Sequence, residues 1–163
     1  MRYIRTVFEH YVTECRVDGR LVQLALLDTA GREDYERLRP LAYTTAHVIL
    51  ICFSVESPDS LENVKQRWSE EAQERCPSVP IILVGLKKDL REDPLIQEEM
   101  RKKSLDFTTP KAGDDMKNFI GARKYLECSS VNGDGVDDVF EAATRESLLL
   151  LDKDERRGCC VVL

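Results

Sequence analysis

The sequence predicts an α/β domain with a mostly parallel sheet and flanking helices. Predicted strands alternate with predicted helices, which is the order of elements in parallel-sheet domains. Residues 48–53 and 81–85 are continuous apolar runs, as expected of strands that are buried on both faces of such a sheet. The chain has 163 residues, of which 42% are hydrophobic, so it is long enough to bury one core.

The first predicted element is a β-hairpin over residues 7–27. Its first arm is rich in β-branched and aromatic residues, Asp18-Gly19 is a strong turn signal, and its second arm is mostly apolar. Residues 33–45 are charged and predict a loop that includes a short helix.

A capping side chain followed by proline marks the start of two helices. The first covers about 57–76, with Ser57 as N-cap and Pro58 at the first helical position. The second covers about 109–121 and begins with a Thr-Pro pair of the same kind. The apolar strand 81–85 lies between them.

Three further segments complete the predicted domain, which covers residues 1–151. Residues 93–104 are charged with few apolar positions and predict a solvated helical insert. Residues 125–128 predict a short strand. Apolar residues at helical spacing predict a last helix that ends near Leu151, and residues 152–163 are expected to form a flexible tail.

Composition argues against several classes of function. The formal charge of −6 leaves no basic surface for nucleic acid. The six cysteines form no C-x-x-C pair and no metal-ligand spacing with the two histidines, which favours a reducing, cytosolic compartment over zinc or disulfides. Cys52 and Cys128 lie in apolar runs and are expected to be small buried hydrophobes. No membrane span or signal peptide is predicted.

Asp28-Thr29-Ala30-Gly31 directly follows a predicted strand. A carboxylate at a strand end can hold Mg²⁺, often through water, and a glycine beyond it lets a backbone N–H approach a terminal phosphate. Taken alone, the motif fits a simple turn or helix cap equally well.

Two later strands end in polar motifs of their own. In Leu86-Lys87-Lys88-Asp89, the carboxylate can accept both N–H groups of a guanine edge, and the stem of Lys87 can lie over the base. Backbone N–H groups of residues 127–130 could meet the guanine O6. Strand ends in this order lie along one rim of a parallel sheet, where such folds bind ligands.

With these motifs in place, the chain resembles the Rho family of Ras-superfamily small GTPases, from about Tyr3 to the last residue. The insert near 93–104 is similar to the extra helix that sets Rho proteins apart from other Ras relatives. The sequences of the switch regions and of the Cys159-Cys160 tail resemble those of fungal Rho proteins. The matching segments are Thr6-Val7-Phe8-Glu9 with Tyr11, DTAGREDYERLRP (28–40), CFSVESPDSL (52–61), VGLKKDLR (84–91), Glu127-Cys128-Ser129 and CVVL (160–163).

The resemblance implies a P-loop NTPase-like domain of the Ras type that binds GTP or GDP with Mg²⁺. Thr6 would ligate the metal directly and Asp28 would hold it through water, while Gly31 would sense the γ-phosphate. The remaining nucleotide contacts would come from Tyr3, Lys87, Asp89, Ser129 and Ser130.

The resemblance also implies a membrane-associated switch that signals to actin, polarity or cell-wall machinery. Its protein partners would be effector kinases or scaffolds, exchange factors, GTPase-activating proteins and dissociation inhibitors. The surfaces that such partners touch would be formed by Val7, Phe8, Glu9, Tyr35, Arg37 and Leu38.

The chain departs from the family pattern at the phosphate grip. It contains no G-x-x-x-x-G-K-[ST] loop and begins at the first switch, so the first strand, the phosphate loop and the first helix are lacking. The lacking strand would lie between the hairpin and strand 48–53, so we expect either a gap or a non-native pairing there. We interpret Met1 as the start of a truncated form. The alternatives to a GTP-binding switch are therefore a nucleotide-free pseudo-GTPase that acts as a binding module, and an unstable fragment of a longer GTPase.

Three single residues also depart from the pattern. Arg32 stands where the family has its water-orienting glutamine, and a guanidinium only donates hydrogen bonds, so hydrolysis should be impaired. An alternative role for Arg32 is that of an arginine finger in cis. Leu86 replaces an Asn or Thr that would brace neighbouring loops, and Leu27 replaces a Trp, which could change the exchange factor recognised.

The tail Cys160-Val161-Val162-Leu163 fits the C-a-a-X pattern, and a terminal Leu predicts geranylgeranylation of Cys160. Stable anchoring normally needs a second signal, and acidic residues offset the basic ones here, so palmitoylation of Cys159 is the better candidate. The expected location is the cytoplasmic face of the plasma membrane or endomembranes, with a cytosolic pool.

Overall fold

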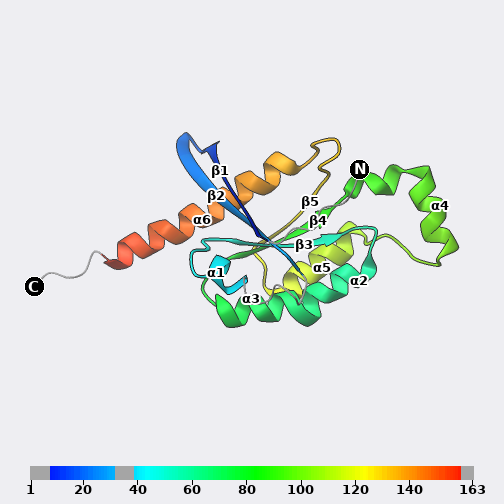
Figure 1. The fold of residues 1–163 in the computed structure, drawn as a ribbon, viewed down its shortest axis with the longest axis horizontal. Coiled ribbons are helices and arrows are strands. Elements are labelled where there is room, and N and C mark those ends of the chain that lie inside the picture. The colour runs from blue at the N-terminus through cyan, green and yellow to red at the C-terminus, as the bar shows by residue number, and fades with distance from the viewer. Residues whose placement is uncertain (1–7, 32–38, 159–163) are drawn as a thin grey trace, which may run out of the picture.

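The computed structural model describes residues 8–31 and 39–158 and confirms an α/β architecture with two separate sheets (Figure 1). One sheet is the antiparallel hairpin of β1 (Phe8–Val17) and β2 (Arg20–Thr29). The other is parallel, in the order β3-β4-β5. Its strands are Ile49–Ser54, Ile81–Leu86 and Lys124–Cys128.

The hairpin turn follows directly from its two residues. Asp18 and Gly19 have φ angles of 51° and 77°, and two positive φ values define the turn that matches the twist of a two-residue hairpin. Next to the turn, Val17 is 1% exposed. Two 3.0 Å hydrogen bonds from the Arg145 guanidinium to the Asp18 carboxylate attach the turn to the last helix. The predicted hairpin is confirmed.

Helices cover both faces of the parallel sheet. On one face the core is formed by Ile51, Phe53, Val55, Val64, Ala72, Ile81, Leu83 and Ile120. On the other face it is formed by Ile82, Val84, Cys128, Val139, Ala142 and Ala143. Alternate residues of β4 point to opposite faces, so its continuous apolar sequence is explained by burial on both sides.

The helix predicted over 57–76 forms as three consecutive pieces, α2 (Pro58–Asn63), the π-helical η2 (Val64–Trp68) and α3 (Ser69–Arg75). The hydroxyl of Ser57 accepts the N–H of Ser60, which confirms the predicted N-cap. A short helix, α1 (Arg39–Tyr43), precedes β3.

The helix predicted over 109–121 is α5 (Pro110–Ile120), with Thr109 as N-cap and Gly121 in the left-handed conformation after it. Gly113 lets α5 approach β5 closely. A Cβ at Gly113 would lie 2.1 Å from Cζ of Tyr125, so no larger residue fits without a shift of the ring.

The predicted insert consists of a 3₁₀ helix, η3 (Lys88–Glu92), and α4 (Pro94–Lys102). The Asp93 side chain caps α4 by accepting the N–H groups of Leu95 and Ile96. Figure 1 shows α4 away from the two sheets, as expected of a solvated helix.

The last helix, α6, runs from Val136 to Gly158, further than the expected end near Leu151. The sequence between these two ends contains no proline and is rich in charged helix-forming residues, so nothing local stops the helix before Gly158. Among the residues described, no helix is both long and apolar enough to cross a membrane.

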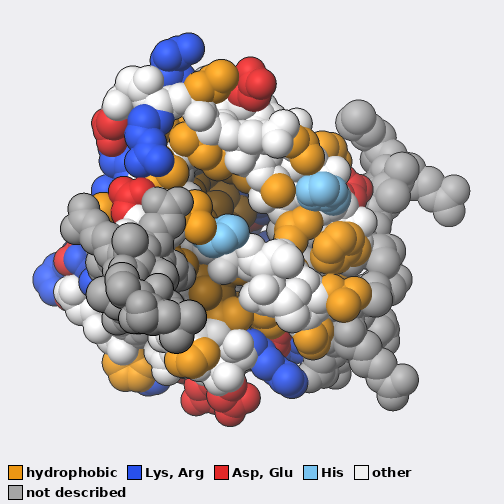
Figure 2. Space-filling model, turned by 90° about the vertical axis from the view of Figure 1, so that its left-hand side faces the viewer, with side chains coloured by type: hydrophobic (Ala, Val, Ile, Leu, Met, Phe, Trp, Pro, Cys, Tyr) orange, Lys and Arg blue, Asp and Glu red, His pale blue; other side chains and the backbone are white. Residues whose placement is uncertain are grey.

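No described strand fills the space between the two sheets, and β2 is not paired with β3. Of the two arrangements expected there, the described residues show the gap rather than a non-native pairing. The prediction that β3 is buried on both faces is wrong in part, because Cys52 is exposed while Ile51 and Phe53 are buried. At the end of the molecule shown in Figure 2, hydrophobic side chains surround a hollow. The interpretation of Cys128 as a buried hydrophobe is confirmed, whereas that of Cys52 is wrong.

Because the turn end of the hairpin is attached to α6 through Arg145 and Asp18, we expect the hairpin to unfold locally when packing at this end is weakened. Val17→Ala removes buried methyl groups and should cost about 1–3 kcal/mol. Hydrogen exchange should accelerate at amides of β1 and β2, with little change in β4. A matched control is Val12→Ala in the same strand, where the residue is 55% exposed. Equal acceleration in β4 would show that the two sheets unfold as one unit.

Candidate functional site

The carboxyl ends of β3, β4 and β5 meet at one edge of the parallel sheet. Each strand is followed there by a loop with charged or hydroxyl side chains: Glu56 after β3, Lys87 to Asp89 after β4, and Ser129 to Asp134 after β5. This edge brings together two of the predicted motifs, the one after β4 and the one after β5. It is the place where parallel α/β sheets bind ligands.

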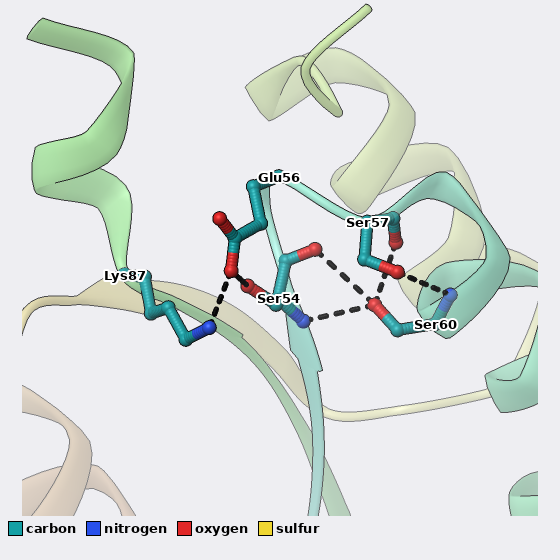
Figure 3. Close-up of polar contacts among 5 residues, drawn as sticks. All are labelled: Ser54, Glu56, Ser57, Ser60 and Lys87. Carbon is teal, nitrogen blue, oxygen red and sulfur yellow. Dashed lines mark hydrogen bonds and ion pairs between the residues drawn. The ribbon is translucent and has the colours of Figure 1, made fainter. Parts of the chain in front are cut away.

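Lys87 turns the chain sharply at the end of β4. Its φ and ψ angles of 60° and 39° lie in the left-handed region, which is uncommon for a residue with a side chain. Its ammonium group forms an ion pair with Glu56 of the β3 loop, and Glu56 Oε1 also accepts from the Ser54 hydroxyl at 3.3 Å (Figure 3). Lys87 is thus held at the edge of the sheet by the neighbouring strand's loop.

The β3 loop itself is fixed by hydroxyl groups. Ser60 Oγ accepts the backbone N–H of Ser54 at 3.0 Å and lies 2.6 Å from the carbonyl oxygen of Ser57, to which it can donate (Figure 3). The same serine donates its own N–H to the Ser57 hydroxyl. These bonds connect the end of β3 to the start of α2, so Glu56 is carried on a constrained turn.

Asp89 carries an unused acceptor. Its Oδ1 atom is buried and has no hydrogen-bond partner among the described residues. Leaving a buried carboxylate oxygen without a donor is costly, so the arrangement favours a ligand that brings N–H groups to it. The adjacent N–H groups on the edge of guanine match this requirement, and Lys87 is two residues away.

Ser129 shapes the β5 loop from within. The residue is fully buried, its hydroxyl accepts the N–H groups of Val131 and Asn132, and its own N–H donates to the carbonyl of Asp134 at 2.8 Å. Its side chain is therefore used for loop geometry, whereas Ser130 is exposed. The expectation that backbone N–H groups of this loop meet the base stays a prediction.

Two further ion pairs connect the segment after β4 with β5 and its loop. Lys88 Nζ lies 2.7 Å from Asp134 Oδ2, which joins the β4 loop to the β5 loop. Arg91 donates two hydrogen bonds to Glu127, the one to Oε1 being 2.8 Å long, and it also donates to the carbonyl of Thr108. Desolvation acts to raise the pKa of Glu127, but hydrogen bonds from Arg91 and Tyr125 outweigh it, so this pKa lies below its usual value.

The motif predicted to meet the phosphates lies on the other sheet. Asp28 is exposed near the end of β2, opposite Glu9 in register, and Gly31 follows shortly after the strand. The Cys52 thiol on β3 is accessible to solvent yet has protein atoms close around it, and desolvation by them is the first cause of its raised pKa, followed by the charges of Cys128 and Asp28. The part of the chain that the structure describes contains no group of three or more His, Cys, Asp or Glu side chains placed to hold a metal ion.

Several predicted site residues lie outside the described part of the chain. Of the predicted partner surface, the structure describes Phe8 and Glu9, which are both exposed on β1. The predicted residues outside the described ranges are Tyr3, Thr6, Val7, Arg32, Tyr35, Arg37, Leu38, Cys159 and Cys160.

The prediction from sequence missed the residues that hold the loops after β3, β4 and β5 in place. Glu56, Arg91 and Asp134 each form an ion pair with a residue of a neighbouring loop or strand. The available signal was charge: opposite charges follow strands that are adjacent in a parallel sheet. The pairing itself depends on strand order and register, which the charges alone do not specify.

Comparison with known proteins adds a family to this geometry. The model of the Ras family matches residues 1–149. The chain is 56% identical over 163 residues to "GTP-binding protein rho2" of Schizosaccharomyces pombe, with 98% of this chain and 82% of the relative covered. It is 55% identical over 161 residues to "GTP-binding protein RHO1" of Candida albicans, with 99% of this chain and 81% of that protein covered.

The Arg91–Glu127 pair generates a prediction about pH. With Arg91 present, Glu127 stabilises the fold above its usual pKa of 4.5, and this contribution is lost as the pH falls through the lowered pKa. In Arg91→Gln the desolvation of Glu127 remains, so the pKa of this carboxyl group should rise. Ionisation of Glu127 as the pH rises should then oppose folding. The stability deficit should therefore grow between about pH 4 and about pH 7 and reach about 2 kcal/mol.

Urea unfolding across this pH range measures the deficit. The control is Arg101→Gln, since Arg101 is 79% exposed and pairs with Glu98 on the surface of α4. Its deficit should stay near zero. A deficit for Arg91→Gln that is the same at every pH would contradict the assignment of the effect to Glu127.

Proposed function

The chain belongs to the Ras family of small GTPases, and within it to the fungal-type Rho GTPases, and on this premise we propose that it is a guanine-nucleotide-dependent switch in membrane-associated signalling. The processes proposed are actin organisation, polarity and cell-wall synthesis. Its partners in this proposal are effector kinases or scaffolds, exchange factors, GTPase-activating proteins and dissociation inhibitors.

The observation that carries the proposal is the buried, unpartnered Oδ1 of Asp89 at the common edge of the three parallel strands. Guanine would present two adjacent N–H groups to the Asp89 carboxylate, one of them to Oδ1, while the stem of Lys87 would cover the base. Lys87 and the residue beside it, Lys88, are each paired with an acidic residue of a flanking loop. The guanine-reading loop therefore has a defined shape before any ligand binds, which lowers the ordering cost of binding.

The phosphate end fits the nucleotide less completely. Asp28 supplies a carboxylate for Mg²⁺, and Thr6 is the proposed direct ligand. Bound Mg²⁺ would offset the negative charge of the phosphates. No glycine-rich phosphate loop is present in the sequence, so we propose that this chain holds the nucleotide more weakly than a GTPase with that loop.

We also propose that hydrolysis is impaired. Arg32 stands at the position of the glutamine that orients the attacking water, and a guanidinium has no acceptor with which to take a hydrogen bond from that water. The switch would then rest mainly in its GTP-bound state.

A second candidate function is a nucleotide-free binding module. The gap between β2 and β3 favours it, because the phosphate-end residues Asp28 and Gly31 lie on the hairpin side of that gap, while Lys87 and Asp89 lie on the other. Such a pseudo-GTPase would still present β1, with Phe8 and Glu9, to partners.

The tail is proposed to anchor the chain to the cytoplasmic face of a membrane. Geranylgeranylation of Cys160 would supply the first signal and palmitoylation of Cys159 the second.

Binding of a fluorescent GDP analogue to the whole chain with Mg²⁺ tests the main proposal. We expect saturable binding, with a ligand-dependent rise in melting temperature. Unlabelled GTP and GDP should displace the fluorescent analogue, whereas ATP should not. Asp89→Ala should abolish binding because the specific acceptor is lost. The control Asp115→Ala removes an exposed carboxylate of α5 and should leave binding unchanged.

The other outcomes separate the alternatives. Absence of binding together with cooperative unfolding would contradict the switch and support the binding module. Absence of both would mean that neither function belongs to this chain and that it is a fragment of a longer GTPase.

Membrane partition tests the anchor. In cells, Cys160→Ser should move the protein to the soluble fraction because no prenyl chain can be added, whereas Cys159→Ser should leave a weaker, more reversible attachment. Fractionation after expression in a eukaryotic host measures this. Cys15→Ser, in β1, is the control for loss of a thiol elsewhere. Unchanged partition of both tail variants would refute the proposed anchor.

A further inference from the structure

Arg39 is the most buried charged residue described, with 3% of its surface exposed. It lies at the start of α1, and its Nε and Nη2 atoms donate to the two oxygens of Glu71 on α3 at 2.7 and 2.9 Å. Glu71 also accepts the hydroxyl of Tyr43 at 2.7 Å. The hydrogen bonds from Arg39 are the largest cause of a lowered pKa at Glu71, so the carboxylate is ionised at neutral pH. A bidentate, buried pair of this kind fixes the orientation of the guanidinium.

The remaining arm of this guanidinium reaches the Asp28–Gly31 motif. Arg39 Nη1 donates to the carbonyl oxygen of Ala30 at 3.3 Å. That carbonyl belongs to the peptide unit whose N–H is the amide of Gly31. Because a trans peptide is planar, with its C=O and N–H pointing in opposite directions, holding the Ala30 oxygen also sets the direction of the Gly31 N–H.

Trp68 supports the same peptide from η2. A Cβ built on Gly31 would lie 3.4 Å from Cζ2 of the indole, so the ring is a direct neighbour of Gly31. The guanidinium groups of Arg39 and Arg67 lie over this ring, 5.3 and 4.6 Å from its centroid. Trp68 also packs against the core of the parallel sheet. These contacts fix the position of Gly31 relative to the helix that covers the parallel sheet, although Gly31 follows a strand of the hairpin.

We propose that Arg39, held by Glu71 and Trp68, is a positioning residue that orients the Gly31 amide and couples it to the η2–α3 helix. The proposal deepens the proposed function, because an oriented Gly31 N–H would act on a terminal phosphate. The orientation itself exists without nucleotide and can be tested without it. Arg39 touches no ligand in this mechanism, and it acts through the Ala30–Gly31 peptide.

The test uses the whole chain with Arg39→Lys, which keeps the charge but lacks the fork needed to reach Glu71 and Ala30 together. In nucleotide-free protein, the ¹⁵N–¹H resonance of Gly31 should shift, and the emission of Trp68, the single tryptophan, should change. The matched control is Arg91→Lys, which alters the other bidentate arginine–glutamate pair, near the base-reading loops. It should leave both signals unchanged. If Arg39→Lys fails to fold, Glu71→Gln, which retains an acceptor for Arg39, should move the same two signals in a folded chain.

Nucleotide binding adds a second readout. Arg39→Lys should weaken binding of a non-hydrolysable GTP analogue about fivefold, the factor for one hydrogen bond, and leave GDP affinity within about twofold. Unchanged Gly31 and Trp68 signals would overturn the positioning role. Equal weakening of both nucleotides would also overturn it, since a general loss of structure would act on both. If Arg39→Lys changes both signals but the wild-type chain binds no nucleotide, the positioning role is supported and the proposed function is contradicted.

Discussion

Pairing of β4 with a parallel strand on each side is the constraint on which the rest of the structure depends. The residues Ile81–Gly85 are all buried, so their backbone groups must be satisfied within the sheet, and this fixes β3 and β5 beside them. Parallel pairing then brings three carboxyl ends to one edge. This pairing makes neighbours of three loops. The first carries Glu56, the second Lys87 and Asp89, and the third Ser129.

The loops at this edge are held mainly by charge. Leu86 supplies no polar group and instead packs against the second core cluster, beneath the loop. Lys87 and Lys88 point to opposite neighbours, Glu56 on the β3 side and Asp134 on the β5 side. Both pairs are partly exposed, so each contributes modestly to stability and will weaken with salt. Their value for a ligand site is that they define the loop's position from both sides.

Much of the fold could be predicted from local sequence because its causes are local. The Asp18-Gly19 turn, the Ser57 and Thr109 caps and the apolar run of β4 each determine an element through neighbouring residues. The failures have long-range causes. The exposure of Cys52 depends on which elements pack over β3, which the strand's own apolar run does not specify, and α6 extends because no local signal ends it at Leu151.

The same distinction applies to the candidate site and explains why Arg39 was not predicted. It lies in a charged stretch that reads as a loop, and its burial depends on Glu71 and Trp68, which follow much later in the chain. The proposed guanine end depends on β4 and β5, whereas the proposed phosphate end belongs to the hairpin, which is not paired with that sheet. Arg39 and Trp68 connect the two, because they join Ala30 and Gly31 to the helix that packs on the parallel sheet. A nucleotide that touched both ends would therefore bind most tightly when this connection already holds Gly31 in place, since less ordering would remain to oppose binding.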